Sequence, residues 1–249
     1  MDKKTMNVKI FSYFSKKLKE AFNLPKYEGL VIDSTSIFEE LPWTPARLNK
    51  FKILIQVEFD VVVDFKGTVE SIVDQIDAKY TQNFFKKGGK WYPRTDTYEF
   101  TGWNIVDRVN ALNPIAVLDV GCGYNLFKDK IQNLTGIDKY NNAADFMVDI
   151  MEYDVAPETY DVALVFGSIN FGSLDLIKLQ MKKVVDLIKK DGMIFIRANA
   201  GQTHPNGSYM NLHYWTFKDA MTVAEYTDCE MLTLKKDAYE RIYVEMRKR

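Results

Sequence analysis

The stretch AVLDVGCGYN, residues 116–125, decides the fold of this chain. Its first half is apolar except for Asp119, which predicts a buried strand. Gly121 and Gly123 then flank Cys122 and predict a tight turn, because residues without bulky side chains let a ligand reach the backbone. A strand followed by such a turn is compatible with several nucleotide ligands, and the stretch alone does not choose among them.

Strand-like and helix-like runs alternate on the carboxyl side of a helix expected at 102–112. Such alternation is typical of a mostly parallel sheet with helices on its faces. Ser173 is expected to cap the best-formed helix, and Asp191-Gly192 to end it. Thr216 and Asp219 resemble a capping box at the start of the last helix. Strands are expected at 115–120, 136–138, 146–149, 161–166 and 193–198, and helices at 126–134, 174–190 and 217–227.

The end of the chain distinguishes between two kinds of doubly wound fold. Residues 230–234 and 241–247 both have strand patterns, and only residues 235–240 lie between them. A helical crossover needs more residues than that, so the two strands are expected to pair in antiparallel fashion. A parallel sheet with such an ending argues against a nicotinamide-dependent oxidoreductase, which would share the glycine turn.

Three aspartates are expected at the ends of successive strands. Asp138 follows Asp119 by nineteen residues, close to the spacing at which an acidic residue accepts hydrogen bonds from ribose hydroxyls. Asp149 ends the next expected strand, where it could meet an adenine amino group. Each aspartate alone could instead cap a nearby backbone N–H in a turn. Their joint placement favours a ligand site.

With this order and spacing, residues 100–249 resemble the class I S-adenosylmethionine-dependent methyltransferases. VLDVGCGYN is similar to their glycine motif, GIDKY to their ribose-binding strand end and FMVDIMEYD to their adenine-contacting segment. YDVALVFGSINFGS, DGMIFIRANAG and EMLTLKKDAYERIYVEMRKR are similar to their fourth strand, fifth strand and closing hairpin. Two departures are Asn125, which replaces a third glycine, and residues 140–145, which are too few for a normal helix.

The resemblance implies the fold, the activity and the cofactor. Residues 91–249 would form an α/β domain with a doubly wound, mostly parallel sheet and an antiparallel C-terminal hairpin strand. The chain would use S-adenosyl-L-methionine to methylate an acceptor. The glycine turn would run along the methionyl part, Asp138 would bind both ribose hydroxyls, and Asp149 with Ile150 would hold adenine. The implied cofactor residues are Asp119, Gly121, Cys122, Gly123, Asn125, Asp138, Lys139, Asp149, Ile150, Gly167, Ser168 and Asn170.

The expected acceptor site lies in the loops after the fourth and fifth strands, with GQTHPNGSYMNLHYW at 201–215. Methyl transfer is an in-line displacement that requires no enzyme nucleophile, so Cys122 is expected to be only a small turn residue. His204 and His213 are candidate general bases, because imidazole exchanges protons near neutral pH. Packing or surface roles are the alternative for both histidines. Tyr98, Phe100 and Thr101 could close over the cofactor.

The sequence FGSIN after the fourth strand also bears on the acceptor. It is not the Asn/Asp-Pro-Pro-aromatic sequence with which some members of the methyltransferase family that the chain resembles bind exocyclic amino groups. Exocyclic amino groups are therefore less favoured as acceptors.

Residues 1–90 are expected to form a small α+β module that contributes to acceptor recognition. Apolar residues every fourth position predict an amphipathic helix at 6–23, and a second helix is expected at 67–85. Alternating apolar residues from Phe51 to Phe65 predict a half-buried strand. Carboxylates on its polar face are expected to be solvated rather than to bind a metal.

Composition narrows the class of protein. Lys and Arg total 33 against 34 for Asp and Glu, which argues against a long nucleic-acid footprint. Only two cysteines occur, and no apolar run reaches the length of a membrane span, so a cytoplasmic protein without a membrane partner or a metal is expected. The acceptor is expected to be a small molecule ahead of RNA or protein. The alternative is a non-catalytic cofactor-binding or scaffold protein with the same fold.

Overall fold

The structure, a computed structural model, describes residues 6–23, 27–87, 102–199, 208–237 and 240–249. The chain divides into two compact units. The first contains Met1–Lys87 and Asn206–Asn211, and the second contains Gly88–Pro205 and Leu212–Arg249. Each unit has an apolar core of its own.

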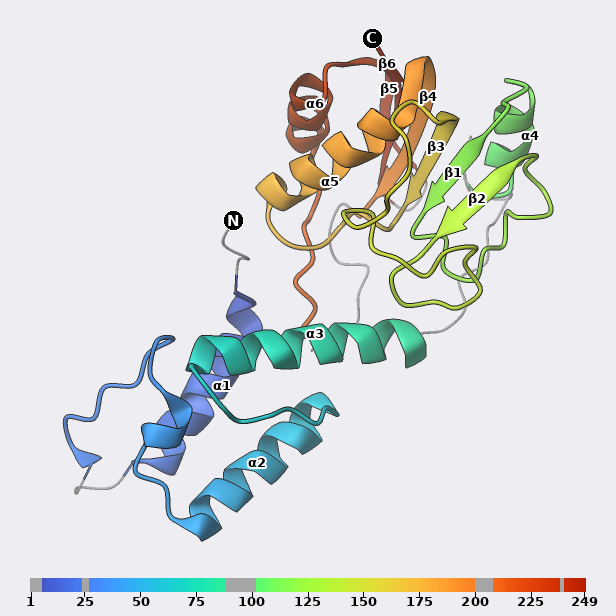
Figure 1. The fold of residues 1–249 in the computed structure, drawn as a ribbon. Helices are drawn as coiled ribbons and strands as arrows, with labels where there is room; N and C mark the ends of the chain where they lie inside the picture. Colours follow the sequence, from blue (N-terminus) through green and yellow to red (C-terminus); the bar gives the residue numbers. More distant parts are fainter. Residues whose placement is uncertain (1–5, 24–26, 88–101, 200–207, 238–239) are drawn as a thin grey trace. The chain divides into compact units, whose positions relative to one another are not determined.

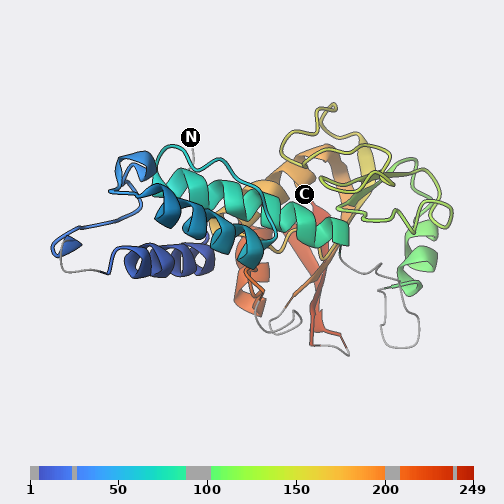
Figure 2. The same ribbon diagram turned by 90° about the horizontal axis from the view of Figure 1, so that it is seen from below.

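The first unit is built from helices. They are α1 (Val8–Ala21), the short 3-10 helix η2 (Phe38–Glu40), α2 (Pro45–Phe59) and α3 (Val69–Lys87). Helix α1 packs against both α2 and α3 (Figure 1, Figure 2). Its buried side chains are the expected ones at every fourth position, so the predicted amphipathic helix is confirmed: Ile10, Phe14, Leu18 and Phe22.

The predicted strand from Phe51 to Phe65 is wrong over most of its length, because residues up to Phe59 form α2. Buried Phe51, Ile55 and Phe59 lie four residues apart, a spacing that satisfies a strand period and a helix period alike. The positions that only a strand would bury, Ile53 and Val57, are 50% and 76% exposed. The alternation is thus a coincidence along one helical face.

The overlooked signal is the start of α2. Thr44 accepts a hydrogen bond from the N–H of Arg47, and Pro45 occupies the first helical turn, where its missing N–H costs nothing. Residues 61–65 lie outside the helix and have no assigned secondary structure, and alternate side chains among them are buried. Among the described residues of the first unit, β pairing is limited to one bridge between Ile37 and Thr68. The expected α+β module is therefore helical in its described parts.

A segment that comes much later in the chain completes the helical unit. The ring of Tyr209 packs edge-on against the rings of Phe59 and Tyr80, and its hydroxyl donates a hydrogen bond to Glu58. The N–H of Tyr209 donates to the hydroxyl of Tyr80 at 3.3 Å. Residues 208–211, part of the expected acceptor loop, thus belong to the first unit, whereas Leu212 and later residues belong to the second.

The second unit contains a six-stranded sheet in the order β2-β1-β3-β4-β6-β5 (Figure 1). The first four strands along this order are parallel, and β6 is antiparallel to both β4 and β5. This confirms the mostly parallel sheet and the antiparallel hairpin. The strands are β1 (Val117–Val120), β2 (Leu134–Ile137), β3 (Tyr160–Phe166), β4 (Ile188–Ala198), β5 (Cys229–Lys236) and β6 (Ile242–Lys248).

Helices lie on both faces of the sheet, as the alternation of runs predicts. Leu118 and Ala163 face one core, which α5 (Leu174–Leu187) and α6 (Phe217–Tyr226) cover. Val117 and Val162 face the opposite core, which α4 (Asn104–Asn110) covers together with Phe127 and Ile131. Every residue of β1 is buried because both of its faces are covered.

The predicted helix starts are confirmed, and one predicted stop is wrong. Ser173 caps α5, and Thr216 with Asp219 forms a complete capping box on α6. Helix α5 ends at Leu187, and β4 begins at once. Asp191 has a left-handed φ of 62° within β4, where the register with β3 shifts, so Asp191-Gly192 marks an irregularity of the strand rather than a helix end.

Two predicted elements near the glycine turn are also wrong. Residues 126–134 form successive turns instead of a helix, with the N–H of Ile131 bonded to the carbonyl of Phe127. Phe127 and Ile131 are buried four residues apart, as in a helix, but Leu134 already starts β2. Of the predicted strand 146–149, only a parallel bridge between Phe146 and Ile137 forms.

Candidate functional site

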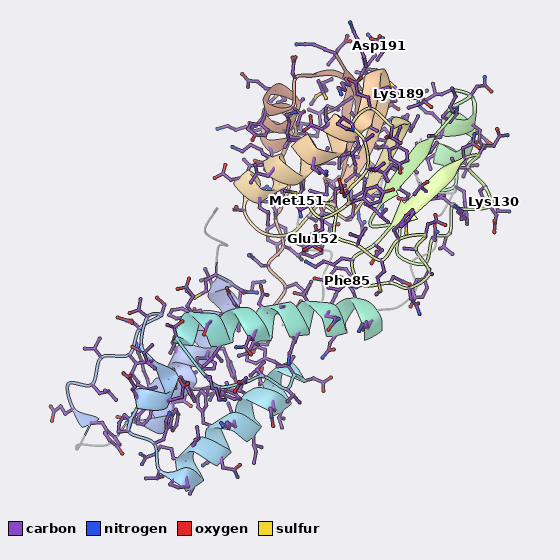
Figure 3. The ribbon with its side chains drawn as sticks, in the orientation of Figure 1. Phe85, Lys130, Met151, Glu152, Lys189 and Asp191 are labelled. Atoms are coloured by element: carbon purple, nitrogen blue, oxygen red, sulfur yellow. The ribbon has the colours of Figure 1, made fainter. Side chains whose placement is uncertain are left out.

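The expected site lies at the carboxyl edge of the parallel strands, where open sheets hold their ligands. Figure 3 shows Lys189 and Asp191 at the amino end of β4. Met151 and Glu152 lie at the opposite end of the second unit, toward the carboxyl ends of the parallel strands. The glycine turn follows β1 at that opposite end. Gly121 and Gly123 have φ values of 68° and 55°, in the left-handed region that favours glycine.

The two glycines differ in what surrounds them. A Cβ on Gly121 would lie 2.2 Å from the Cβ of Ser168, in the loop after β3. A Cβ on Gly123 would meet nothing within 4 Å. Gly121 therefore allows the loops after β1 and β3 to touch, whereas the space beside Gly123 is open.

Replacing Gly121 by alanine should lower the free energy of unfolding by about 3 kcal/mol or more. The new methyl group would overlap the Cβ of Ser168, which cannot move away without a shift of its backbone. Gly123→Ala is the matched control, since it carries the left-handed strain alone, at a cost of about 1–2 kcal/mol. Urea unfolding of both variants, followed by intrinsic fluorescence, measures the difference. Equal losses would show that the contact with Ser168 is unimportant.

Asp138 holds the glycine turn against the end of β2. One of its carboxylate oxygens accepts the N–H of Gly123 at 3.0 Å, and the other accepts the N–H groups of Tyr140 and Asn141 at 2.8 and 2.9 Å. A carboxylate offers about four acceptor positions, so these three bonds leave capacity for a ligand hydroxyl. The capping role that the sequence left open is thus real, and it is compatible with ribose binding.

Asp119 is a buried carboxylate, only 3% exposed, at the carboxyl half of β1. Burial raises its pKa to about 7, and the nearby charge of Asp138 contributes to the rise. No hydrogen-bond donor within the described part of the chain offsets this cost. A carboxylate in such surroundings is stabilised by a cation placed beside it.

Gly136 of β2 is packed against the glycine turn. A Cβ there would lie 2.5 Å from Oδ1 of Asn125 and 2.8 Å from the sulfur of Cys122. Burial raises the pKa of the Cys122 thiol, as do the nearby carboxylates, of which Asp119 acts most strongly. The thiol is therefore protonated at neutral pH, in line with the expectation that Cys122 is no nucleophile.

One residue of this region, Asp145, was missed by the sequence analysis. It accepts hydrogen bonds from the N–H of Gly136 at 2.7 Å and from the ammonium group of Lys128 at 2.8 Å. Asn125 is fixed in the same place, because its amide donates to the carbonyl of Ala143 at 3.3 Å. Asp145 lies in a loop without a recognisable motif, so its position relative to β2 becomes visible only in the structure.

Asp149 and Lys139 form an ion pair of 2.8 Å. The other carboxylate oxygen of Asp149 accepts the N–H of Met151 at 2.9 Å, and this bond fixes the turn after it. The side chain of Ile150 is buried in the sheet core together with Tyr153. In this segment, Ile150 therefore offers its backbone rather than its side chain to a ligand.

Unsatisfied polar groups gather beyond β3. Oδ1 of buried Asn170 accepts the N–H of Asn199 at 3.1 Å, while its Nδ2 has no partner within the described residues. The hydroxyl of Ser168 is likewise buried and unpaired there. Gly167, with a φ of 79°, donates its N–H to the carbonyl of Arg197 at 2.8 Å. Buried groups of this kind mark a place where a ligand or water completes the hydrogen bonding.

His213 is the one candidate base that the structure describes, whereas His204, Tyr98, Phe100 and Thr101 lie outside the described residues. The N–H of His213 donates to the carbonyl of Asn170 at 2.7 Å. Its Nε2 lies 3.5 Å from Oδ2 of Asp219. The sequence did not reveal this carboxylate partner, although it identified Asp219 as part of a capping box.

Within the described residues, no group of three or more His, Cys, Asp or Glu side chains is arranged to hold a metal ion. None of the helices in the described ranges is long and apolar enough to cross a membrane.

No protein-family model matches the chain, and no curated protein matches it. Solved structures that do match include the [4+2]-cyclase SpnF, at 14% identity and a TM-score of 0.48, over 70% of this chain and 95% of that one. The N-methyltransferase NodS from Bradyrhizobium japonicum, in complex with S-adenosyl-L-homocysteine, matches at 14% identity and a TM-score of 0.46, over 59% and 85%.

A third match is the 1,6-didemethyltoxoflavin-N1-methyltransferase from Burkholderia thailandensis, at 13% identity and a TM-score of 0.47, over 84% of this chain and 92% of that one. Its structure contains 1,6-didemethyltoxoflavin and S-adenosylhomocysteine. In this chain, the glycine turn follows β1, and the parallel strands end in a hairpin whose last strand, β6, lies between β4 and β5. By this topology, the chain belongs to the proteins with a class I methyltransferase fold.

Proposed function

We propose that this chain is an S-adenosylmethionine-dependent methyltransferase that acts on a small molecule. The observation that carries the proposal is the buried carboxylate of Asp119, which lies without a hydrogen-bond donor among the described residues beside the glycine turn. The methionyl end of the cofactor carries an ammonium and a sulfonium group. Either cation would offset part of the free energy that burial of the charged carboxylate costs.

The remaining site residues fit the other parts of the cofactor. Asp138 retains acceptor capacity for the ribose hydroxyls, and the 149–150 segment, fixed by Lys139, would hold adenine. The unpaired groups of Ser168 and Asn170 would lie around the exit of the methyl group. The proposed cofactor residues are Asp119, Gly121, Cys122, Gly123, Asn125, Asp138, Lys139, Asp149, Ile150, Gly167, Ser168 and Asn170.

The local structure argues against a dinucleotide in the same place. A pyrophosphate is normally bound at the N-terminus of the helix that follows the glycine turn. Residues 121–133 are described throughout, and they form turns rather than an α-helix. A buried carboxylate at Asp119 would also repel a pyrophosphate. A sulfonium ligand with a net positive charge and no pyrophosphate meets neither obstacle.

The bound cofactor would supply a methyl group on a positively charged sulfur. The chain's part is to align the acceptor with that methyl group and to exclude water, for which no covalent intermediate is needed. The raised pKa of Cys122 keeps its thiol protonated, which agrees with a reaction that uses no enzyme nucleophile. A small-molecule acceptor is favoured because the formal net charge of −1 gives no broad attraction to nucleic acid.

Isothermal titration of the full chain with S-adenosylmethionine and S-adenosylhomocysteine tests the proposal. We expect one site per chain with micromolar affinity for both ligands and no binding of NADH, the matched control ligand. Absence of binding at millimolar concentrations of either sulfur ligand would refute the function. Tight binding without methyl transfer to any acceptor would favour a non-catalytic cofactor-binding protein.

A further inference from the structure

The backbone of His213 is fixed at the carboxyl edge of the sheet. Its N–H donates to the carbonyl of Asn170, which follows β3, at 2.7 Å. Two residues later, the N–H of Trp215 donates to the carbonyl of Asn199, which follows β4, at 2.8 Å. The buried indole of Trp215 also donates to the carbonyl of Ile169 at 3.1 Å. His213 is therefore held over the two central strands, on the edge where the ligand is expected.

The imidazole of His213 has a fixed carboxylate beside it. Its Nε2 is buried, makes no hydrogen bond among the described residues and lies 3.5 Å from Oδ2 of Asp219. The same oxygen of Asp219 accepts the N–H and the hydroxyl of Thr216, both at 2.8 Å. The capping box thus holds the carboxylate in place before any ligand binds. The side chain of His213 as a whole is 18% exposed, so the accessible part of the ring lies away from Nε2.

An imidazole oriented by a carboxylate is the usual arrangement of a general base. The nearby carboxylate of Asp219 favours a proton on Nε2, which leaves the lone pair of Nδ1 available to take a proton. The structural alternative is that His213 only packs edge-on against Trp215, whose ring centroid is 6.2 Å away. That contact explains the position of the ring but requires no carboxylate beside Nε2.

We propose that His213, positioned by Asp219, deprotonates a hydroxyl group of the acceptor, so that the acceptor is a phenol or an alcohol. This inference rests on the proposed methyltransferase function. The hydroxyl proton passes to Nδ1 of His213 while the oxygen forms a bond to the methyl carbon. The carbon–sulfur bond breaks, and its electron pair stays on sulfur, which becomes a neutral thioether as the imidazole becomes a cation.

Hydroxyl groups need such a base more than amines do. A neutral amine already has a nucleophilic lone pair, and it can lose its proton to water after the transfer. A hydroxyl oxygen becomes a strong nucleophile only as its proton leaves, so a positioned base contributes about 100-fold to 10,000-fold to the rate.

The test measures transfer of labelled methyl from S-adenosylmethionine to shape-matched pairs of probes: phenols against anilines, and primary alcohols against primary amines. We expect methyl ethers as products. His213→Ala should lower turnover about 100-fold or more, and added imidazole should restore part of it through the accessible side of the site. Asp219→Asn, which keeps an acceptor for the Thr216 cap, should lower turnover about 10-fold. Neither variant should change the Kd for S-adenosylhomocysteine more than about twofold.

Ser173→Ala is the matched control, because it removes the cap of α5 at a cost of about 1 kcal/mol and leaves the His213–Asp219 pair intact. Its turnover should equal that of the unmodified chain. Three outcomes would overturn the proposal: N-methylated products alone, ether formation that survives His213→Ala, or no methylated hydroxyl probe although S-adenosylhomocysteine binds. Failure of the chain to bind S-adenosylmethionine and S-adenosylhomocysteine would instead remove the methyltransferase function itself.

Discussion

Asp138→Asn should weaken the binding of S-adenosylhomocysteine about 100-fold. A hydrogen bond to a charged group contributes about 1.5–3 kcal/mol, and two ribose hydroxyls are expected to share this carboxylate, so the loss should reach about 3 kcal/mol. The three backbone bonds that Asp138 already accepts hold it in place, so little ordering is needed when the ligand arrives. Isothermal titration of the full chain at fixed salt measures the change.

The same substitution also disturbs the glycine turn, and a ligand variant separates the two effects. An asparagine can turn its amide N–H toward the N–H of Gly123, which would displace the turn. S-adenosylhomocysteine without its two ribose hydroxyls should bind the unmodified chain about 100-fold more weakly, but should bind Asp138→Asn no more weakly than the full ligand does. If both proteins lose affinity equally, Asp138 is only a structural residue.

Asp145→Asn is the matched control for Asp138. It removes a neighbouring carboxylate that holds β2 through Gly136 and Lys128 but has no expected contact with ribose. We expect this variant to be less stable and yet to distinguish the full ligand from the ligand without hydroxyls as strongly as the unmodified chain does.

The fold of the second unit was predictable because its sequence patterns extend over many residues and agree with one another. Strand β3 is a run of apolar residues, α5 has both a cap and a regular apolar stripe, and six residues between two strands permit only a hairpin. Helix α2 was not predicted, because apolar residues spaced by four fit both a strand period and a helix period. The helix start at Thr44-Pro45 was overlooked. The turns at 126–134 were missed because a short apolar repeat does not show whether the chain has room to close a helix.

The contact between Asp138 and the glycine turn was predictable, because the spacing of the strand ends carries that information. Asp138 lies at the position where a strand end meets the glycine turn, and the structure shows the two in contact. The partners of these residues were not predictable. Asp145 reaches Gly136 from a loop without a motif, and Asp219 has a local role as a cap that conceals its proximity to His213. Pairings of this kind arise from tertiary packing rather than from the local sequence.

Asp119→Asn should stabilise the unliganded chain at pH 8 by on the order of 4 kcal/mol, and should leave its stability at pH 4 nearly unchanged. In the folded chain the pKa of Asp119 is raised to about 7, mainly by burial and further by Asp138. Its stabilising contribution is therefore complete below about pH 4 and is lost as pH rises through 7. Asparagine removes that loss, because it has no charge to bury. Urea unfolding at pH 4, 6 and 8 measures the effect.

Binding should respond to the same substitution with the opposite sign. The ammonium group of the ligand prefers an ionised Asp119, so affinity for S-adenosylhomocysteine should rise between about pH 5 and 7 and then level off. Asp119→Asn should bind about 30-fold more weakly at pH 8 and should lose this pH dependence. Titrations at pH 5 and 8 with both proteins test this. Equal stabilisation at both pH extremes, or an unchanged affinity, would show that Asp119 is not poised for a cation. A side chain whose replacement raises the free energy of unfolding and lowers the affinity for the ligand contributes to binding rather than to stability.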